Sequence, residues 1–241
     1  MSDPEAGDQQ STRPVGSGIE DLGAFGRGLD LSTLRRAYAA QPLLEAEMAA
    51  DPFAQFASWF SEVVQLPEAV VEPNAMVFST ADENGHPSSR TVLLKGVDER
   101  GFVLFTNYGS RKGREALANP FASLVFPWHQ VERQVVVVGA VEKVEQSVTA
   151  EYFASRPRES QIGAWTSRQS TVVASREELE ARRVELERRF EGAPVPVPDF
   201  WGGLRVVPET VEFWHGRAGR LHDRLRYNRD GASWTLERLS P

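Results

Sequence analysis

Short apolar and β-branched runs separated by tight turns fill most of the chain after residue 75, and this pattern limits it to an antiparallel β fold. Asp82-Glu-Asn-Gly85 and Asp98-Glu-Arg-Gly101 are typical of hairpin turns. Strands are predicted over 76–81, 91–95, 102–106, 122–128, 134–141, 204–207, 210–214, 225–228 and 234–239. The expected fold class is therefore mainly β with flanking helices (α+β), built on an antiparallel sheet or barrel.

A helix is predicted to begin at Asp51, which can cap it, with Pro52 in the first turn. Its apolar face consists of Phe53, Phe56, Phe60 and Val63, which follow at helical spacing. Further helices are expected over 31–50, over 147–155, from Arg114, and from Ser175, where Ser175 and Glu178 form a capping box. Pro157 is expected to end the helix over 147–155, because the residue before a proline avoids the helical region.

Residues 1–30 are rich in Gly, Ser, Asp and Gln and have little to bury, so a disordered tail is expected there. Residues 31–241 are then expected to form a single domain. The N-terminus lacks the order of charges and apolar residues of a signal peptide, and no apolar run approaches the ~20 residues that cross a bilayer. The absence of cysteine suits a reducing compartment. We therefore expect a cytoplasmic protein without a membrane partner.

The net charge of −7 makes the basic clusters local features, and it argues against a nucleic-acid partner. Local arginine clusters on an acidic protein fit a phosphorylated small molecule better. The four histidines form no metal-binding pair, and no cysteine thiolate is present. No metal site is therefore expected.

The C-terminal segment 212–224 concentrates cations beside aromatic residues. It contains Trp214, Arg217, Arg220, His222 and Arg224. Such a cluster repels itself unless an anion joins it, and arginine both binds phosphate and stacks on flat rings. The segment predicts a site for an anion with a ring system, although an exposed basic strand end would have the same composition. Arg220 and His222 alternate along the chain, so an extended backbone would point both side chains the same way.

Two further cationic pairs lie near predicted strands. Arg90 and Lys95 bracket the strand 91–95, and Arg111-Lys112 follow the strand 102–106 among small residues. Backbone N–H groups and adjacent charges in that second position can seat a phosphate. Solvated strand ends and a solvated turn are the alternatives.

A third group lies at the end of the predicted helix 147–155. Tyr152 and Arg156 are four residues apart and share one helix face, and Ser160 follows just beyond Pro157. The two hydroxyls and the guanidinium can converge on one phosphate. Packing of the Arg156 stem against Tyr152 is the alternative.

Together these segments resemble the pyridoxine (pyridoxamine) 5′-phosphate oxidase family. The matching motifs are Arg90-Thr-Val-Leu-Leu-Lys95, Thr106-Asn-Tyr-Gly-Ser-Arg-Lys112, Phe126-Pro-Trp-His129, Glu132-Arg-Gln134, Ser155-Arg-Pro-Arg-Glu-Ser-Gln-Ile-Gly-Ala-Trp165, Phe200-Trp-Gly-Gly203 and Arg220-Leu-His-Asp-Arg224. The resemblance implies an FMN-binding split β-barrel and a homodimer with FMN at the subunit interface. It also implies oxidation of pyridoxamine or pyridoxine 5′-phosphate to pyridoxal 5′-phosphate, with O2 reduced to H2O2.

The resemblance also implies residue roles. FMN contacts are expected from Arg90, Thr91, Val92, Leu93, Leu94, Lys95, Phe105, Thr106, Arg111, Lys112, Gln134, Gln169, Ser170, Trp214 and Arg224. Substrate contacts are expected from Arg35, Tyr38, Lys95, Tyr152, Arg156, Ser160, Arg220 and His222, the last two being the catalytic pair over the pyridine ring. Phe105 departs from the family pattern, in which a Tyr often precedes Thr106.

Two alternative functions stay open. A related split-barrel flavin oxidase would act on another aromatic substrate, such as a phenazine precursor. A non-catalytic protein would hold FMN or pyridoxal phosphate without turnover, and its binding residues would look the same.

Overall fold

The computed structural model describes residues 24–25, 29–30, 37–38 and 40–241. The chain divides into two units, residues 1–38 and residues 39–241. In the first, β1 (Ala24–Phe25) and β2 (Leu29–Asp30) form a two-stranded antiparallel pair. The disordered tail expected over 1–30 lies largely outside the described residues, as does Arg35.

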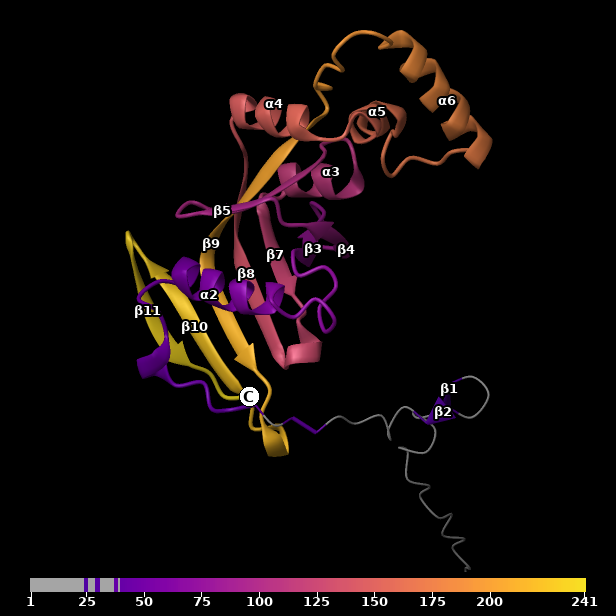
Figure 1. Ribbon diagram of the computed structural model, residues 1–241. Helices are drawn as coiled ribbons and strands as arrows, with labels where there is room; N and C mark the ends of the chain where they lie inside the picture. Colours follow the sequence, from indigo (N-terminus) through magenta and orange to yellow (C-terminus); the bar gives the residue numbers. More distant parts are fainter. Residues whose placement is uncertain (1–23, 26–28, 31–36, 39) are drawn as a thin grey trace, which may run out of the picture. The chain divides into compact units, whose positions relative to one another are not determined.

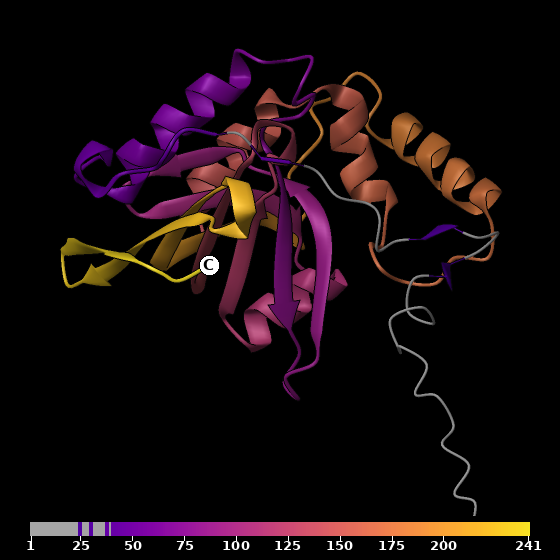
Figure 2. The same cartoon turned by 90° about the horizontal axis from the view of Figure 1, so that it is seen from below.

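The second unit is built on one antiparallel sheet, which confirms the mainly β fold class. The strand order is β11-β10-β9-β8-β7-β3-β4, with β6 pairing both β9 and β5. The strands are β3 (Ala75–Ala81), β4 (Pro87–Leu93), β5 (Gly96–Asp98), β6 (Gly101–Asn107), β7 (Phe121–Phe126), β8 (Arg133–Lys143), β9 (Trp201–His215), β10 (Asp223–Asp230) and β11 (Ser233–Arg238). Figure 2 shows that the sheet curls into an open half-barrel.

Strand β9 is the longest element of the sheet and runs from one end of the unit to the other (Figure 1). Two separate strands, 204–207 and 210–214, were expected in this place. They are one strand because every residue of β8 pairs with β9, and the register shifts where Val138 pairs with Thr210 and Gly139 with Pro208, which leaves Glu209 as the extra residue of a bulge. The first part of β9 pairs with β6 and the last part with β10. This single strand therefore connects both ends of the fold.

Helix α2 (Pro52–Val64) packs its apolar face on the inner side of the curled sheet, as expected. The carboxylate of Asp51 accepts hydrogen bonds from the backbone N–H groups of Phe53 and Ala54, so it caps the helix. Phe56 meets Phe102 with ring centroids 5.0 Å apart. Trp59, which was not expected in the core, meets Phe213 at 5.1 Å. Large aromatic areas buried on one helix face supply much of the stability of this core.

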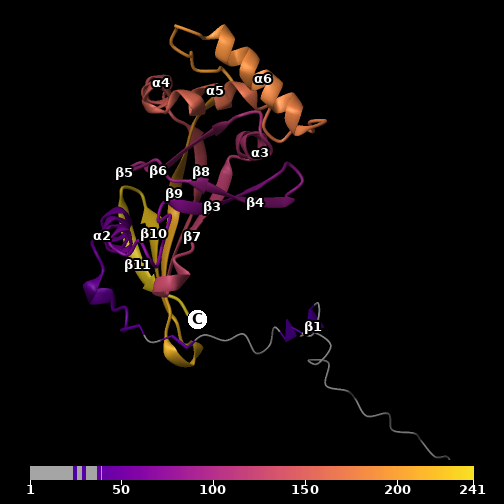
Figure 3. The same cartoon turned by 45° about the vertical axis from the view of Figure 1, so that its right-hand side comes forward.

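The remaining helices gather at the end of the sheet where β9 begins (Figure 3). They are α3 (Arg111–Ala118), α4 (Gln146–Ser155), α5 (Arg158–Thr166) and α6 (Arg176–Arg189). A second apolar cluster joins α4, α5 and α6, and its buried members are Phe153, Ile162, Leu186, Phe190, Val195 and Trp201. Among the described residues, no helix has the length and apolarity needed to cross a membrane.

Helix α5 was not predicted, because Pro157 was read only as the end of α4. Pro157 instead precedes the first turn of α5 with φ −52°, a value that a helix start favours. Helix α3 begins at Arg111, three residues earlier than expected, and Ser110 caps it by accepting from the Gly113 N–H. Strand β4 ends at Leu93, and Lys95 lies beyond it.

The prediction of a helix over 31–50 is wrong for the residues of this segment that the structure describes. Only the 3-10 turn η2 (Glu45–Glu47) is helical there. The backbone of this segment bonds to side chains elsewhere: the Ala40 N–H donates to Glu132 Oε2 and the Leu43 N–H to Asp223 Oδ2, both at 3.0 Å. The Leu43 carbonyl accepts from Arg238 at 2.7 Å. These tertiary contacts replace the hydrogen bonds of a helix.

Candidate functional site

A cavity of about 440 Å³ lies where the ends of β4 and β6 meet helices α3, α4 and α5. Eleven of the residues predicted to bind ligands line it: Thr91, Val92, Leu93, Lys95, Phe105, Thr106, Lys112, Tyr152, Arg156, Ser160 and Gln169. They come from segments of the chain between residues 91 and 169. The fold therefore brings the predicted substrate clamp and much of the predicted cofactor seat into one cavity, which we call the donor cavity.

Arg156 is a partly buried cation at the wall of the donor cavity. It caps the C-terminus of α4, and its guanidinium lies 4.8 Å from the centre of the Trp201 ring. Burial lowers its pKa below the ordinary value for arginine. Its buried Nη1 has no hydrogen-bond partner among the described residues. A buried donor of this kind is costly unless an acceptor joins it, so the position favours an anion.

Two further residues of the cavity, Thr106 and Lys112, carry hydrogen-bond donors that would suit an anion. The buried Oγ1 of Thr106 also finds no hydrogen-bond partner in the described part of the chain. Lys112 Nζ donates to Gln169 Oε1 at 2.8 Å, and burial together with the charge of Arg90 lowers the pKa of Lys112. A ligand phosphate would offset both the burial and the repulsion.

Four predicted cofactor residues are neighbours in sequence of residues that line the donor cavity, but do not line it themselves. Arg90 and Arg111 both contact the carboxylate of Glu115 on α3. Ser170 has φ 70°, a left-handed conformation that is uncommon for a residue with a side chain, and it lines a smaller neighbouring cavity of about 270 Å³. Leu94 is 8% exposed and belongs to the apolar core. Its side chain therefore offers no contact to a ligand in the donor cavity.

A second group of predicted residues forms a row across three strands. Gln134 on β8 is in register with Trp214 on β9, which is in register with Arg224 on β10. Their neighbours Val135, Phe213 and Leu225 are buried in the core. The three row residues therefore project from the outer face of the sheet. We call them the outer row.

Within the outer row, Arg224 is oriented by Glu212. Its Nε and Nη2 donate to the two carboxylate oxygens at 2.7 and 2.9 Å, and the hydrogen bond to Glu212 raises the pKa of Arg224. Such a two-point contact fixes the plane of the guanidinium. The remaining edge of Arg224 includes Nη1, which donates to the Ser240 carbonyl at 3.1 Å.

The loop after β9 carries Arg220 and His222. Arg220 ends the 3-10 turn η4 (Ala218–Arg220) with φ 61°, so the extended backbone expected from 220 to 222 is wrong. The His222 ring lies 4.7 Å from the Trp214 ring. Its Nδ1 accepts from the Arg217 N–H at 3.1 Å, which places the proton of the neutral ring on Nε2. A strained backbone at a predicted catalytic residue agrees with a positioned side chain.

The outer row and the η4 loop lie far from the donor cavity. Trp201 lines that cavity at the start of β9, and Trp214 stands near the end of the same strand. Trp214 comes thirteen positions after Trp201, which corresponds to roughly 40 Å along β9. Figure 1 shows the helices around the donor cavity and the η4 turn at opposite ends of the unit. One chain alone does not bring the two groups to one ligand.

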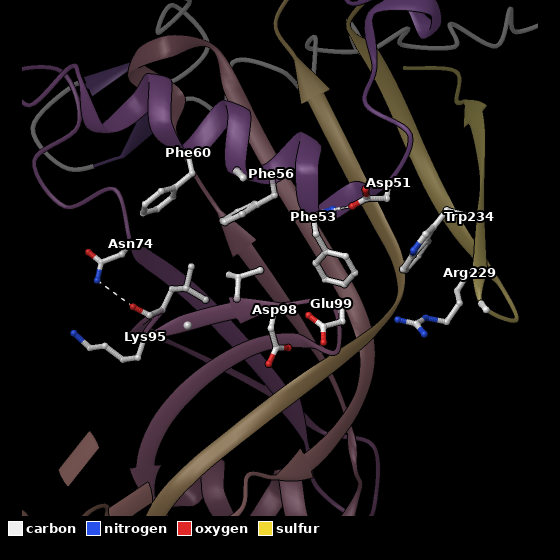
Figure 4. A pocket seen from close by; sticks show the side chains of 15 residues that line it. Asp51, Phe53, Phe56, Phe60, Asn74, Lys95, Asp98, Glu99, Arg229 and Trp234 are labelled. Carbon is white, nitrogen blue, oxygen red and sulfur yellow. Dashed lines mark hydrogen bonds between the residues drawn. The ribbon is translucent and has the colours of Figure 1, made fainter. Parts of the chain in front are cut away.

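A larger cavity of about 830 Å³ opens between α2, β5 and the β10–β11 turn (Figure 4). Phe53, Phe56 and Phe60 of α2 line it, and the Trp234 ring lies beside Phe53 with ring centroids 6.1 Å apart. Of the described site residues, Leu94 and Lys95 line it. Asp51 is engaged in capping α2. Most of the predicted site residues therefore line the donor cavity and not the larger one, and Lys95 lines both cavities.

Some residues that shape the donor cavity were not predicted from the sequence. Trp201 and Asn107 both lie within family motifs, but neither was given a role in the site. Glu115 was also missed, although its position four residues after Arg111 on a helix is a recognisable ion-pair spacing. Tyr38 is described but belongs to the first unit.

Comparison with known proteins adds family information to this geometry. Residues 63–189 match the model of the family described as pyridoxamine 5′-phosphate oxidase, and residues 201–241 match the pyridoxine 5′-phosphate oxidase C-terminal dimerisation region. A pyridoxine/pyridoxamine 5′-phosphate oxidase of Frankia alni is 56% identical over 217 residues, covering 89% of this chain and 90% of the relative. The protein of that name from Rubrobacter xylanophilus is 56% identical over 212 residues, covering 88% and 97%.

Two solved structures share the fold. PhzG from Burkholderia lata 383, in complex with tetrahydrophenazine-1-carboxylic acid, superposes with a TM-score of 0.78 at 29% identity, covering 86% of this chain and all of that one. A pyridoxamine 5′-phosphate oxidase-related, FMN-binding protein from Nostoc punctiforme PCC 73102 has a TM-score of 0.63 at 15% identity, covering 80% of this chain and all of that one.

Proposed function

The chain belongs to the pyridoxamine 5′-phosphate oxidase family, and we propose that it uses FMN to oxidise pyridoxamine or pyridoxine 5′-phosphate to pyridoxal 5′-phosphate. Pyridoxine phosphate would transfer two electrons and two protons to O2 through the flavin, giving H2O2. Pyridoxamine phosphate would in addition take up water and release ammonia. The observation that carries the proposal is the pair of buried donors without hydrogen-bond partners, Thr106 Oγ1 and Arg156 Nη1, which belong to residues that line the same cavity as Lys95 and Lys112.

The reaction needs seats for two phosphorylated molecules, and the donor cavity supports both. Lys112, Thr106 and the neighbouring Arg111 suit the phosphate of FMN, at the start of helix α3. Tyr152, Arg156, Ser160 and Lys95 suit the phosphate of the substrate. FMN, when bound, supplies the two-electron acceptor for the reaction. The residues of this chain supply binding and orientation.

Arg220 and His222 are proposed to act on the substrate ring. With its Nδ1 accepting from the Arg217 N–H, a neutral His222 offers Nε2–H as a donor to an oxygen or nitrogen of the substrate. Arg220 places a fixed positive charge on the same loop. These groups can orient the ring and stabilise negative charge on it as hydride leaves the reacting carbon.

A second copy of the chain is proposed to complete each site. The C-terminal residues 201–241 match the family's dimerisation region, and the chain forms a homodimer. These residues include Trp214, Arg220, His222 and Arg224, which lie roughly 40 Å along β9 from the donor cavity of their own chain. A two-fold arrangement that places the outer row of each copy against the partner's donor cavity forms two equivalent sites.

The alternative functions differ in what they require. A phenazine-type oxidase, suggested by the fold of PhzG, has no use for a clamp directed at a substrate phosphate. The relatives that are 56% identical carry the B6 oxidase name, whereas PhzG is 29% identical. A protein that only binds FMN has no need for two separate anion seats. Both alternatives are therefore less favoured.

Anaerobic mixing of the flavin-loaded protein with pyridoxamine 5′-phosphate tests the proposal. Loss of the flavin absorbance on mixing, and its return with formation of pyridoxal 5′-phosphate when air is admitted, is the expected result. An unphosphorylated vitamer and a dihydrophenazine carboxylate serve as comparison substrates. No bleaching by any B6 vitamer would refute the oxidase, and faster bleaching by the phenazine compound would favour the alternative substrate.

A further inference from the structure

Glu115 is a buried carboxylate at the meeting point of β3, β4 and α3, and the proposed reaction leaves it without a role. The residue is 6% exposed. Its Oε1 accepts from Arg111 Nε at 2.7 Å, and its Oε2 accepts from Thr80 Oγ1 at 2.5 Å and from the Ser88 hydroxyl. Arg90 Nη2 lies 3.4 Å from the same oxygen. Four side chains thus converge on one carboxylate.

The carboxylate is held in its charged form. Burial alone would raise the pKa of Glu115, but the hydrogen bonds from Ser88, Thr80 and Arg111 outweigh burial and lower the pKa to about 2. At neutral pH Glu115 is therefore an anion that faces two guanidinium groups. This charge offsets the mutual repulsion of Arg90, Arg111 and Lys112.

The contacts of Glu115 also set the direction of both arginines. Arg111 uses Nε for Glu115, and its two terminal nitrogens have no hydrogen-bond partner among the described residues. Arg90 is held on several sides, because Nη1 donates to the Phe78 carbonyl at 3.0 Å and to Thr80 Oγ1 at 2.7 Å. Since Arg111 is exposed and carries a long side chain, its guanidinium would otherwise sample many rotamers.

We propose that Glu115 is a positioning residue that holds Arg90 and Arg111 in place for the phosphate of the flavin cofactor. The inference rests on the proposed function, in which this corner of the donor cavity seats that phosphate. Glu115 would thus favour the binding of an anion although it is itself negatively charged, because it fixes the orientation of two arginines that contact that anion. Coulomb's law alone predicts the opposite effect, because removing a nearby negative charge should tighten an anion.

Positioning and simple electrostatics therefore predict opposite changes in FMN affinity when Glu115 is replaced, and a titration can distinguish them. Flavin-free protein is titrated with FMN and, separately, with riboflavin, which lacks the phosphate. In the Glu115→Gln and Glu115→Asp variants the dissociation constant for FMN should rise by about tenfold or more, the loss of one charge-assisted contact. The constant for riboflavin should change by less than about twofold, since no phosphate contact is at stake. Glu115→Asp matters because it keeps the charge and retracts the carboxylate.

Glu151→Gln is the matched control, since Glu151 is exposed on α4 and its substitution changes the net charge by the same amount. It should leave both dissociation constants near the wild-type values. Tighter or unchanged FMN binding in both Glu115 variants would overturn the proposal in favour of bulk electrostatics. Equal weakening of FMN and riboflavin would also overturn it, by showing a merely structural role.

The proposed function has a separate criterion in the same titrations. If the wild-type protein binds FMN no more tightly than riboflavin, this corner seats no flavin phosphate, and the proposed cofactor site fails first. If the Gln variant does not fold, as judged by its circular dichroism, the Asp variant alone decides between the outcomes.

Discussion

The ring of Phe105 on β6 stacks on the ring of Tyr152 on α4, with centroids 3.9 Å apart and planes 19° from parallel. Phe105 also stacks on Trp201 at 5.5 Å. Phe105 was predicted as an FMN contact, but in this arrangement its side chain supports the tyrosine of the proposed substrate clamp. The stack ties the end of the sheet to the helix that carries Tyr152 and Arg156.

Phe105→Leu should therefore weaken substrate binding more than flavin binding. An aromatic pair contributes about 0.5–1.5 kcal/mol beyond its buried area, so the Michaelis constant for pyridoxine 5′-phosphate should rise by roughly 2–10-fold. Phe105→Tyr is the control, since it retains the stack and restores the residue common in the family. Steady-state kinetics at saturating FMN measure the effect. Loss of flavin with an unaltered Michaelis constant would assign Phe105 to the cofactor instead.

Arg156→Ala should raise the Michaelis constant for pyridoxine 5′-phosphate by about 10–150-fold, because one charge-assisted hydrogen bond contributes about 1.5–3 kcal/mol. Turnover at saturation should fall less, since the phosphate is remote from the reacting carbon. The preference for phosphorylated over unphosphorylated pyridoxine should shrink. Arg188→Ala, on the exposed side of α6, is the control. An unchanged preference would reduce Arg156 to a packing residue on Trp201.

Mixed dimers test whether two chains share each site. Arg156→Ala and His222→Ala alter residues from the two groups that lie at opposite ends of one chain. Each variant alone should be nearly inactive at low substrate concentration. After the two are unfolded and refolded together in equal amounts, about a quarter of the wild-type turnover should return, because half of the dimers hold one intact site. Absence of recovery, with mixed dimers verified by mass spectrometry, would mean that one chain builds the whole site.

Much of the fold was predictable because it follows from local patterns. Phe53, Phe56 and Phe60 repeat at helical spacing, and Asp51 caps their helix as expected. The failures come from tertiary contacts. The segment after Tyr38 is not helical, because Glu132, Asp223 and Arg238 bond its backbone. Pairing with β8 makes β9 a single strand, which neither half of its sequence indicates.

The site was predictable in a different sense. The family motifs predicted which residues bind ligands, and eleven of these residues line one cavity. No motif reveals that Gln134, Trp214 and Arg224 share a cross-strand row, because register depends on pairing between distant segments. Nor does a motif reveal the separation of that row from the cavity, which is set by the length of β9.

Gly139→Ala should destabilise the protein. A Cβ at this position would lie 1.9 Å from the Val207 carbonyl oxygen and 2.8 Å from Pro208 Cα, so the backbone of the bulge would have to shift. The expected loss is about 2–4 kcal/mol in the free energy of unfolding, measured by denaturant titration. Gly163→Ala on α5 is the matched control, because open space surrounds it and alanine favours a helix by about 1 kcal/mol. Equal stability of the two variants would contradict the tight contact.

Acid should release the stabilisation that Glu115 provides. Its pKa is lowered from 4.5 to about 2 in the folded protein, so the folded state binds this proton less readily than the unfolded chain does. The contribution is complete above pH 4.5 and is lost as the pH falls toward 2. Over that window the wild type should lose on the order of 2 kcal/mol more stability than Glu115→Gln, as followed by denaturant titration at each pH. Parallel acid profiles would place the carboxylate in a more solvated setting.

The length of β9 has a consequence for how the protein behaves on dilution. Because the two groups of residues of the proposed site lie at opposite ends of β9, a single subunit would contain no complete site. Specific activity should then depend on protein concentration, falling toward zero as subunits separate, and FMN should slow that loss because the proposed site places it in contact with both chains. Abundance in the cell would in this way set not only how many catalysts exist but what fraction of them is assembled.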